Sequence, residues 1–187
     1  MCGGGGAGGG GNVGTGNSVG GGGAAGAALD FVINGPIAGG PVVIGAGGLG
    51  VLASAGAPGG TTSVTINAVV YSAAPGDGGQ RENSLSPEVP VFALGGFTLP
   101  GSSAVGIVSG DNGMQGSMVQ DPGLIAVGGS GGSGRFGIGG PAFNSGGNGL
   151  PGTGNGSGGS GGRSPFLGVD TIGGDGTSGV VVIDEYL

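Results

Sequence analysis

The sequence contains no histidine, no tryptophan and no lysine, and it has a single cysteine, Cys2. A disulfide framework or a Cys/His metal cluster needs several of these residues, so both are excluded. Cys2 has no histidine to activate it as a nucleophile. The carboxylates, such as Asp30 with Asp77 or Asp111 with Asp121, show no pattern that indicates a glycosidase pair. We therefore predict no enzyme activity, no catalytic residue, no cofactor and no metal.

Positive charge is also scarce. The only cations are Arg81, Arg135 and Arg163, and the net charge is −7. Nucleic-acid binding needs several cations to neutralise phosphates, so we exclude nucleic acid as a partner. No run of about 18 apolar residues exists, and the start lacks a basic segment followed by a long apolar one. We expect neither membrane insertion nor a secretory signal.

Glycine dominates what is present, with 59 of 187 residues, and there are 11 prolines. Collagen is excluded because Asn12 and Thr15 interrupt the three-residue frame set by Gly3, Gly6 and Gly9. A glycine share this large is typical of disordered chains, but those chains also carry many charges. Only 7% of this chain is charged, and Val, Ile, Leu and Phe make up about 24%. We therefore favour an ordered structure.

Two glycine-rich stretches need a structural explanation. Glycine fills 14 of the 21 positions from residue 3 to residue 23, and 18 of the 36 from Gly128 to Arg163. Without Cβ atoms, such segments can pack as polyproline-II helices whose N–H and C=O groups pair with neighbouring segments. The alternative for residues 3–23 is a flexible linker, because ordering glycine costs more backbone entropy than ordering any other residue.

Short strands are predicted between these stretches. Val180–Tyr186 gives the clearest signal, because three valines and an isoleucine favour a pleated, at least half-buried surface. Other predicted strands cover residues 29–34, 41–44, 61–71, 91–94, 97–99, 104–108 and 124–127. Polar residues and prolines predict exposed loops over Ser72–Pro90 and Ser109–Pro122.

These patterns predict one all-β domain over residues 1–187, built from short strands and glycine-rich polyproline-II-like segments with almost no helix. The glycine blocks cover residues 3–28 and 128–163, and the strand-rich parts cover residues 29–127 and 164–187.

One motif imitates a nucleotide site. Gly45, Gly47 and Gly50 follow a predicted strand with the spacing of the dinucleotide-binding fingerprint. That fingerprint needs a helix directly after it, and Gly56, Pro58 and two further glycines leave no room for one. We interpret the match as a coincidence of glycine content.

The order of several segments resembles a known family. Val42–Gly48, Gly59–Val64 and above all the closing Gly173–Tyr186 resemble the glycine-rich C-terminal domain of bacteriophage tail-fibre and adhesin-tip proteins. The resemblance implies a polyglycine-II sandwich whose connecting loops contact the host surface. Family members usually carry this domain behind a fibre shaft, whereas this chain starts at Met1. We therefore expect either a separate tip docked on another fibre or a small structural virion component.

Candidate receptor-binding residues lie where a rigid scaffold would display loops. Loop side chains and two phenylalanines that interrupt glycine-rich stretches are the candidates: Arg81, Glu82, Asn83, Asp111, Asn112, Met114, Met118, Phe143 and Phe166. The alternative for the loop residues is plain solvation, and for the two phenylalanines it is a place in a local core.

The expected function is attachment of a phage virion to a bacterial surface receptor, protein or glycan. The expected location is the virion, at the tail fibre or tail tip, with other tail or fibre proteins as partners. The expected assembly is a homotrimer or a subunit docked on a trimeric fibre. Two alternatives stay open: a purely structural fibre, collar or decoration subunit, and an ice-binding protein, against which the threonines are scattered.

Overall fold

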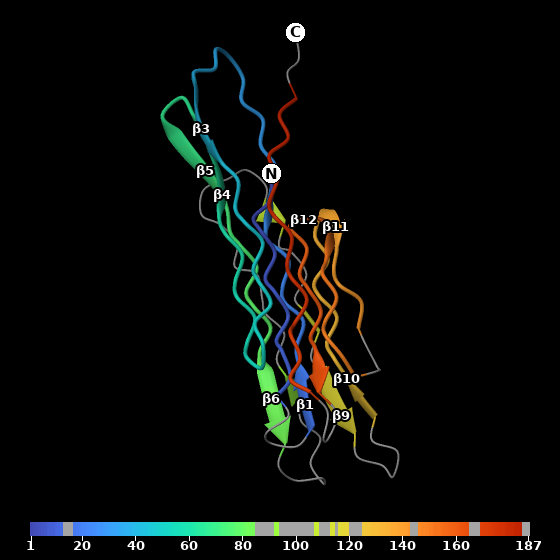
Figure 1. Cartoon of the computed structure of the whole chain (residues 1–187). Coiled ribbons are helices and arrows are strands. Elements are labelled where there is room, and N and C mark those ends of the chain that lie inside the picture. Colours follow the sequence, from blue (N-terminus) through green and yellow to red (C-terminus); the bar gives the residue numbers. More distant parts are fainter. Residues whose placement is uncertain are drawn as a thin grey trace.

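The computed structural model describes residues 1–12, 17–84, 92–93, 107–108, 113–114, 116–119, 125–142, 146–164 and 169–184. These residues contain no helix, and their regular structure consists of short antiparallel strands, so the predicted all-β class is confirmed. Nothing in this part of the chain is a helix long and apolar enough to cross a membrane. Figure 1 shows an elongated bundle of extended segments that run side by side, with small sheets towards its two ends.

The strands of the described residues form five small sheets. One sheet has the order β3-β4-β5, with β3 at Gly39–Val43, β4 at Thr62–Ile66 and β5 at Val69–Ala73. A second has the order β13-β1-β6, built from Arg163–Ser164, Asn17–Gly20 and Arg81–Ser84. The others are β10-β9-β7 (Ile125–Val127, Gly116–Val119 and Phe92–Ala93), β11-β12 (Phe136–Ile138 and Thr153–Asn155) and β2-β8 (Ala28–Leu29 and Ile107–Val108).

Most of the bundle is held together by backbone hydrogen bonds between glycine-rich segments. The first segment, residues 2–11, is buried throughout. Its N–H groups donate to three different neighbours in turn, with a period of three residues. The N–H groups of residues 2, 5 and 8 donate to the carbonyls of residues 180, 177 and 174, and those of residues 3, 6 and 9 donate to residues 27, 24 and 21. The N–H groups of residues 4, 7 and 10 donate to the carbonyls of residues 60, 57 and 54. Three residues per turn is the geometry of a polyproline-II helix, so each turn bonds to three neighbours.

The carbonyl groups of the same segment accept bonds from three further neighbours. Gly4 and Ala7 accept from the N–H groups of Gly76 and Gly79, at 2.9 and 2.8 Å. The carbonyls of residues 6 and 9 accept from residues 159 and 162, and that of residue 5 accepts from residue 48. The first segment therefore has hydrogen-bonded neighbours on six sides. The polyproline-II prediction is confirmed, and the flexible-linker alternative is wrong for residues 3–12 and 17–23.

Close approach of backbones explains why these segments are glycine. A Cβ built on Gly6 would lie 2.0 Å from the carbonyl oxygen of Asp77, and one on Gly8 would lie 2.0 Å from that of Ser160. The false nucleotide fingerprint has the same explanation. A Cβ on Gly45 would meet the carbonyl oxygen of Gly60 at 2.0 Å, and no helix follows the motif.

Hydroxyl groups complete some of these bonds inside the bundle. Thr62 and Thr171 are buried, and their Oγ1 atoms accept the N–H groups of Gly45 and Gly11, at 3.0 and 2.9 Å. The Oγ of Ser160 accepts the N–H of Leu150 at 2.8 Å. A buried N–H needs an acceptor, so these side chains stand in for carbonyl groups.

The side-chain core is small. Met1, Leu29, Val64 and Ala73 form a buried cluster, and Phe31, Ile66, Tyr71 and Val181 pack against it. The rings of Phe31 and Tyr71 stack with their centroids 4.3 Å apart. This cluster joins the β3-β4-β5 sheet to Met1, the residue that precedes the first segment.

The prediction of a closing strand over Val180–Tyr186 is wrong where the structure describes it. Only Val180 pairs, as an isolated bridge to Cys2, and residues 181–184 belong to no sheet. Val181 packs against the small core, whereas Val182 and Ile183 are 56% and 63% exposed. β-Branched residues favour extended backbone, but a strand also needs a partner, and the bundle supplies one only at Cys2. Residues 185–186 lie outside the described residues.

The single strand predicted over residues 61–71 is a hairpin. β4 and β5 pair antiparallel, with Ile66 opposite Val69, around a turn at Asn67 and Ala68. Both turn residues have positive φ, 50° and 61°, which matches the right-handed twist of a two-residue hairpin. Asn67 stabilises the turn, because its Oδ1 accepts the N–H of Ala38 at 2.7 Å. The sequence Asn-Ala did not indicate this turn, whereas Asn-Gly is a strong signal for a two-residue hairpin turn.

Other element predictions are corrected in part. In residues 29–34 only Leu29 is in a strand, because the chain leaves the bundle after β2. The predicted loop Ser72–Pro90 is wrong in two places: residues 74–80 are a bundle segment bonded to the first segment, and residues 81–84 form β6. In the predicted loop Ser109–Pro122, residues 116–119 form β9. The strands predicted at residues 41–44 and 124–127 are confirmed as β3 and β10, within two residues at each end.

Replacing an interior glycine by alanine should strongly destabilise the bundle. For Gly6→Ala we expect the free energy of unfolding to fall by about 2–3 kcal/mol or more, because the new methyl group would displace a backbone segment. Gly39→Ala is the matched control, since nothing lies within 4 Å of a Cβ there. Thermal unfolding followed by circular dichroism measures both. Equal midpoints for the two variants would contradict the packing argument.

Removing a buried hydroxyl acceptor should also lower stability. Thr62→Val keeps the shape of the side chain but leaves the N–H of Gly45 without its acceptor, so we expect a loss of about 1–3 kcal/mol. Thr153→Val is the control, because Thr153 is exposed and its hydroxyl makes only a long bond of 3.4 Å to the carbonyl of Ile138. Denaturant unfolding of both variants tests this, and a larger loss for Thr153→Val would refute it.

Candidate functional site

The structure places the first group of predicted binding residues on a strand. Arg81, Glu82 and Asn83 lie in β6, where they pair with Gly20, Val19 and Ser18 of β1. The Arg81 guanidinium donates to the carbonyl of Ala53, so its contact is internal. Glu82 is exposed, and its backbone carbonyl accepts the Ser18 hydroxyl at 3.0 Å. The Glu82 side chain is therefore available to a partner, whereas the Arg81 side chain connects β6 to the segment that contains Ala53.

The second group is divided. Met114 is part of the bundle, since its N–H donates to Ser130 and its carbonyl accepts from Gly22, yet its side chain is 64% exposed. Met118 lies in β9, opposite Ala126 of β10. The structure describes only the backbone at Asn83 and Met118. Four further candidates lie outside the described residues: Asp111, Asn112, Phe143 and Phe166.

Several strands gather at one end of the bundle. β1 contacts β7, β9 and β10 as well as its partners β6 and β13, so the two sheets that hold Glu82 and Met118 adjoin each other. Figure 1 shows β1, β6, β9 and β10 together at the end opposite to β3, β4 and β5. We call this group of five strands, β1, β6, β9, β10 and β13, the recognition end. It unites the first candidate group with Met118, and Met114 lies next to it, just before β9 and bonded to Gly22 just after β1.

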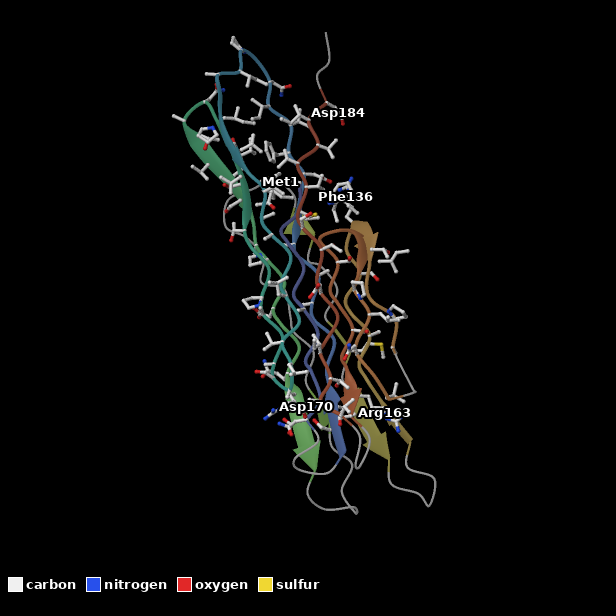
Figure 2. All side chains as sticks on the ribbon, viewed as in Figure 1. Met1, Phe136, Arg163, Asp170 and Asp184 are labelled. Atoms are coloured by element: carbon white, nitrogen blue, oxygen red, sulfur yellow. The ribbon has the colours of Figure 1, made fainter. Side chains whose placement is uncertain are left out.

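The cations of the chain are all engaged or enclosed. Arg81 contacts Ala53, and Arg135 forms an ion pair with Asp30 and lies over the ring of Phe136 at 5.6 Å from its centroid. Arg163 lies in β13, at the recognition end (Figure 2), and is only 9% exposed. The chain therefore offers no cluster of exposed cations to a polyanionic partner.

A shallow hollow was missed by the sequence analysis. It has a volume of about 320 Å³ and lies on the β11-β12 hairpin, lined by Arg135, Phe136, Ile138 and Thr153 among others. Its ring, guanidinium and hydroxyl groups could contact a small polar molecule, but the hollow is open rather than enclosed. The adjacent Arg135 and Phe136 within a glycine-rich stretch are the only sequence signal that could have indicated it.

The described residues offer no metal site. No group of three or more His, Cys, Asp or Glu side chains lies close enough to hold a metal ion there. Asp30, considered above as half of a carboxylate pair, forms the ion pair with Arg135 instead.

The buried groups at the start of the first segment have shifted pKa values. The α-amino group of Met1 donates to the carbonyl of Leu29 at 2.8 Å, and burial lowers its pKa. Burial raises the pKa of the Cys2 thiol, which is 2% exposed. Both shifts arise because a charged form loses water inside the bundle. They report the packing of this segment and indicate no reactive nucleophile.

Stability should fall at alkaline pH because of Cys2. The folded protein holds the thiol proton more tightly than the unfolded chain, so this contribution is complete below the ordinary thiol pKa and is lost as pH rises through the raised value. We expect the midpoint of urea unfolding to drop more between about pH 8 and 10.5 in the wild type than in Cys2→Ala. Parallel curves for the two proteins would show that the thiol is not desolvated.

No protein-family model matches the chain, and no characterised protein is similar to it in sequence.

Proposed function

We propose that this protein is a tail-fibre or adhesin-tip component of a bacteriophage virion that attaches to a bacterial surface receptor. The observation that carries the proposal is the backbone-bonded bundle, which holds the recognition end in a fixed position. A stiff scaffold that displays the residues at its end is suited to recognising a surface, because little ordering entropy is lost on binding.

The closing segment and the recognition end support the proposal from different directions. The segments Val42–Gly48, Gly59–Val64 and Gly173–Tyr186 resemble those of phage fibre tips, and in the structure they belong to the bundle over most of their length. The recognition end carries Glu82 and the β9 strand with Met118. The partner would be a neutral or basic receptor, protein or glycan, because the exposed surface has no cationic cluster.

A second function is favoured by one specific observation. The guanidinium of Arg81 bonds to Ala53 within the chain instead of facing solvent, as expected of a residue that serves folding. A purely structural virion subunit, such as a fibre, collar or decoration protein, would need the bundle but no receptor-binding residue. In both cases the partners would be other tail or fibre proteins, in a homotrimer or docked on a trimeric fibre.

Adsorption of the purified protein to bacteria tests the proposal. We expect fluorescently labelled protein to bind cells of a susceptible strain and to block adsorption of the phage. Glu82→Lys should weaken this binding by about fivefold or more if Glu82 contacts the receptor, since a central contact contributes at least about 1 kcal/mol. Thr61→Lys is the control, because Thr61 is also exposed, directly precedes β4 and lies outside the recognition end.

Immunogold labelling of virions separates the two functions. Labelling at the distal fibre tip together with cell binding supports the adhesin. Labelling of the virion without any cell binding supports the structural subunit. Protein that is absent from virions would exclude both.

A further inference from the structure

The chain between β2 and β3 contains an asparagine followed by a glycine, Asn34 and Gly35. The loop that holds them lies beside the β4-β5 turn, because Asn67 of the turn donates to the carbonyl of Pro36 at 3.3 Å and accepts the N–H of Ala38 at 2.7 Å. Figure 1 shows this loop (blue) at the end of the bundle that carries β3, β4 and β5. Asn34 and Gly35 are both exposed, so water reaches the pair.

An asparagine followed by a glycine can react with its own backbone. The backbone nitrogen of the glycine attacks Cγ of the asparagine, an N–Cγ bond forms, the Cγ–Nδ2 bond breaks, and ammonia leaves with the proton that the nitrogen has lost. Water then opens the resulting succinimide ring at either carbonyl, which yields aspartate or isoaspartate. Glycine is the favourable neighbour because it has no Cβ beside the attacking nitrogen. The reaction consumes only water, is promoted by hydroxide and changes no oxidation state.

The structure leaves the reacting atoms of this pair free. Within the described part of the chain, no hydrogen bond holds the N–H of Gly35 or the side chain of Asn34. Nothing lies within 4 Å of a Cβ built on Gly35, so the space around its Cα is open. Its φ is +101°, in a region that favours glycine. The nitrogen of Gly35 can therefore lose its proton and turn towards the Asn34 side chain without breaking an interaction.

A second pair, Asn148 and Gly149, is held by the bundle. The N–H of Gly149 donates to the carbonyl of Ile172 at 2.8 Å, and Oδ1 of Asn148 accepts the N–H of Ile172 at 3.0 Å. Asn148 is exposed, as Asn34 is, so access to water does not distinguish the two asparagines. The difference lies in the hydrogen bonds, which fix both the nitrogen that would attack and the side chain that it would attack.

A third pair, Asn155 and Gly156, is held in the same way. The N–H of Gly156 donates to the carbonyl of Ser178 at 2.8 Å, and Nδ2 of Asn155 donates to the same carbonyl at 3.4 Å. A fourth asparagine followed by glycine, Asn112, lies outside the described residues. Among the three pairs that the structure describes, the pair at Asn34 is the one whose reacting atoms are free.

We propose that Asn34 is a site of spontaneous modification, at which the folded protein converts the side-chain amide to a carboxylate by way of a succinimide. The product places a negative charge in residues 31–76, a stretch that contains no Asp, Glu, Lys or Arg. Isoaspartate also adds one carbon to the main chain between two fixed points, the stacked rings of Phe31 and Tyr71 and the bonds made by Asn67. Older copies of the protein therefore differ from new ones at this end. The proposal does not rest on attachment to a host.

Peptide mass spectrometry of the folded full chain, incubated in mildly alkaline buffer, tests this. Chymotrypsin cleaves after Phe31 and Leu49, and the peptide between them contains no asparagine or glutamine other than Asn34. We expect the mass change from amide to acid to accumulate about tenfold or more faster at Asn34 than at Asn148, because two hydrogen bonds must break at Asn148 before its glycine can react. Fragment ions assign each change to a residue, and an unincubated sample corrects for conversion during digestion.

The same chain unfolded in urea is the matched reference. Both pairs lose their tertiary hydrogen bonds there, so we expect Asn34 and Asn148 to react at similar rates. Asn34→Gln is the matched variant, because a glutamine side chain cyclises far less readily and the Asn34 side chain makes no hydrogen bond that the change would remove. This variant should abolish the mass change in its peptide without altering the thermal unfolding midpoint.

Three results would overturn the proposal. The first is an Asn34 that stays unchanged in the folded protein, and the second is conversion of Asn148 at an equal rate. The third is a preference for Asn34 that is as large in urea as in the folded protein, since the local sequence and not the fold would then explain it. Binding to bacteria plays no part in these measurements, so the attachment proposal and this one can fail separately.

Discussion

The whole bundle depends on a single steric condition, the absence of a Cβ atom where one backbone passes another. Carbonyl oxygens lie about 2 Å from the positions that Cβ atoms would occupy at Gly3, Gly5, Gly6 and Gly8. That proximity lets every N–H of residues 2–10 reach a carbonyl of a neighbouring segment. The entropy lost by ordering glycine is opposed mainly by these bonds, which are individually modest but form a continuous array. The hydrophobic cluster around Met1, Leu29, Val64 and Ala73 is small by comparison.

Sequence reasoning predicted the bundle better than the strands. A glycine share near one third, few charges and no collagen period leave few ordered solutions, and the polyproline-II prediction followed from them. Strand predictions failed at residues 180–184 and 30–34, because β-branched residues favour extended backbone without supplying a partner. The hairpin at Asn67 and Ala68 was missed because Ala68 adopts a positive φ that alanine rarely adopts. Arg81 was predicted in an exposed loop, but it lies half-buried on β6, and its bond to Ala53 depends on a distant turn that no local pattern shows.

The two ends of the bundle differ in chemistry. The recognition end combines several short strands with Glu82 and Arg163, whereas the β3-β4-β5 sheet at the opposite end contains no charged residue and carries half-exposed valines. The long axis between them is formed by backbone bonds in which side chains take little part. An arrangement of this kind allows the chemistry of one end to change without disturbing the other, which suits the adhesin role proposed above.

Hydrogen bonds that join backbone groups only, without side chains, also have a consequence for folding. A glycine helix shifted along its axis by one turn would offer its neighbours the same donors and acceptors, so many misaligned bundles would have almost the native energy. Only the interspersed larger residues distinguish them: Ala7 and Ala24 within the helices, and the hydroxyls of Thr62, Thr171 and Ser160 at single positions. These few residues therefore select the native register among several of nearly equal energy. We expect folding to be slow, because segments that pair in a shifted register must separate before they can pair correctly.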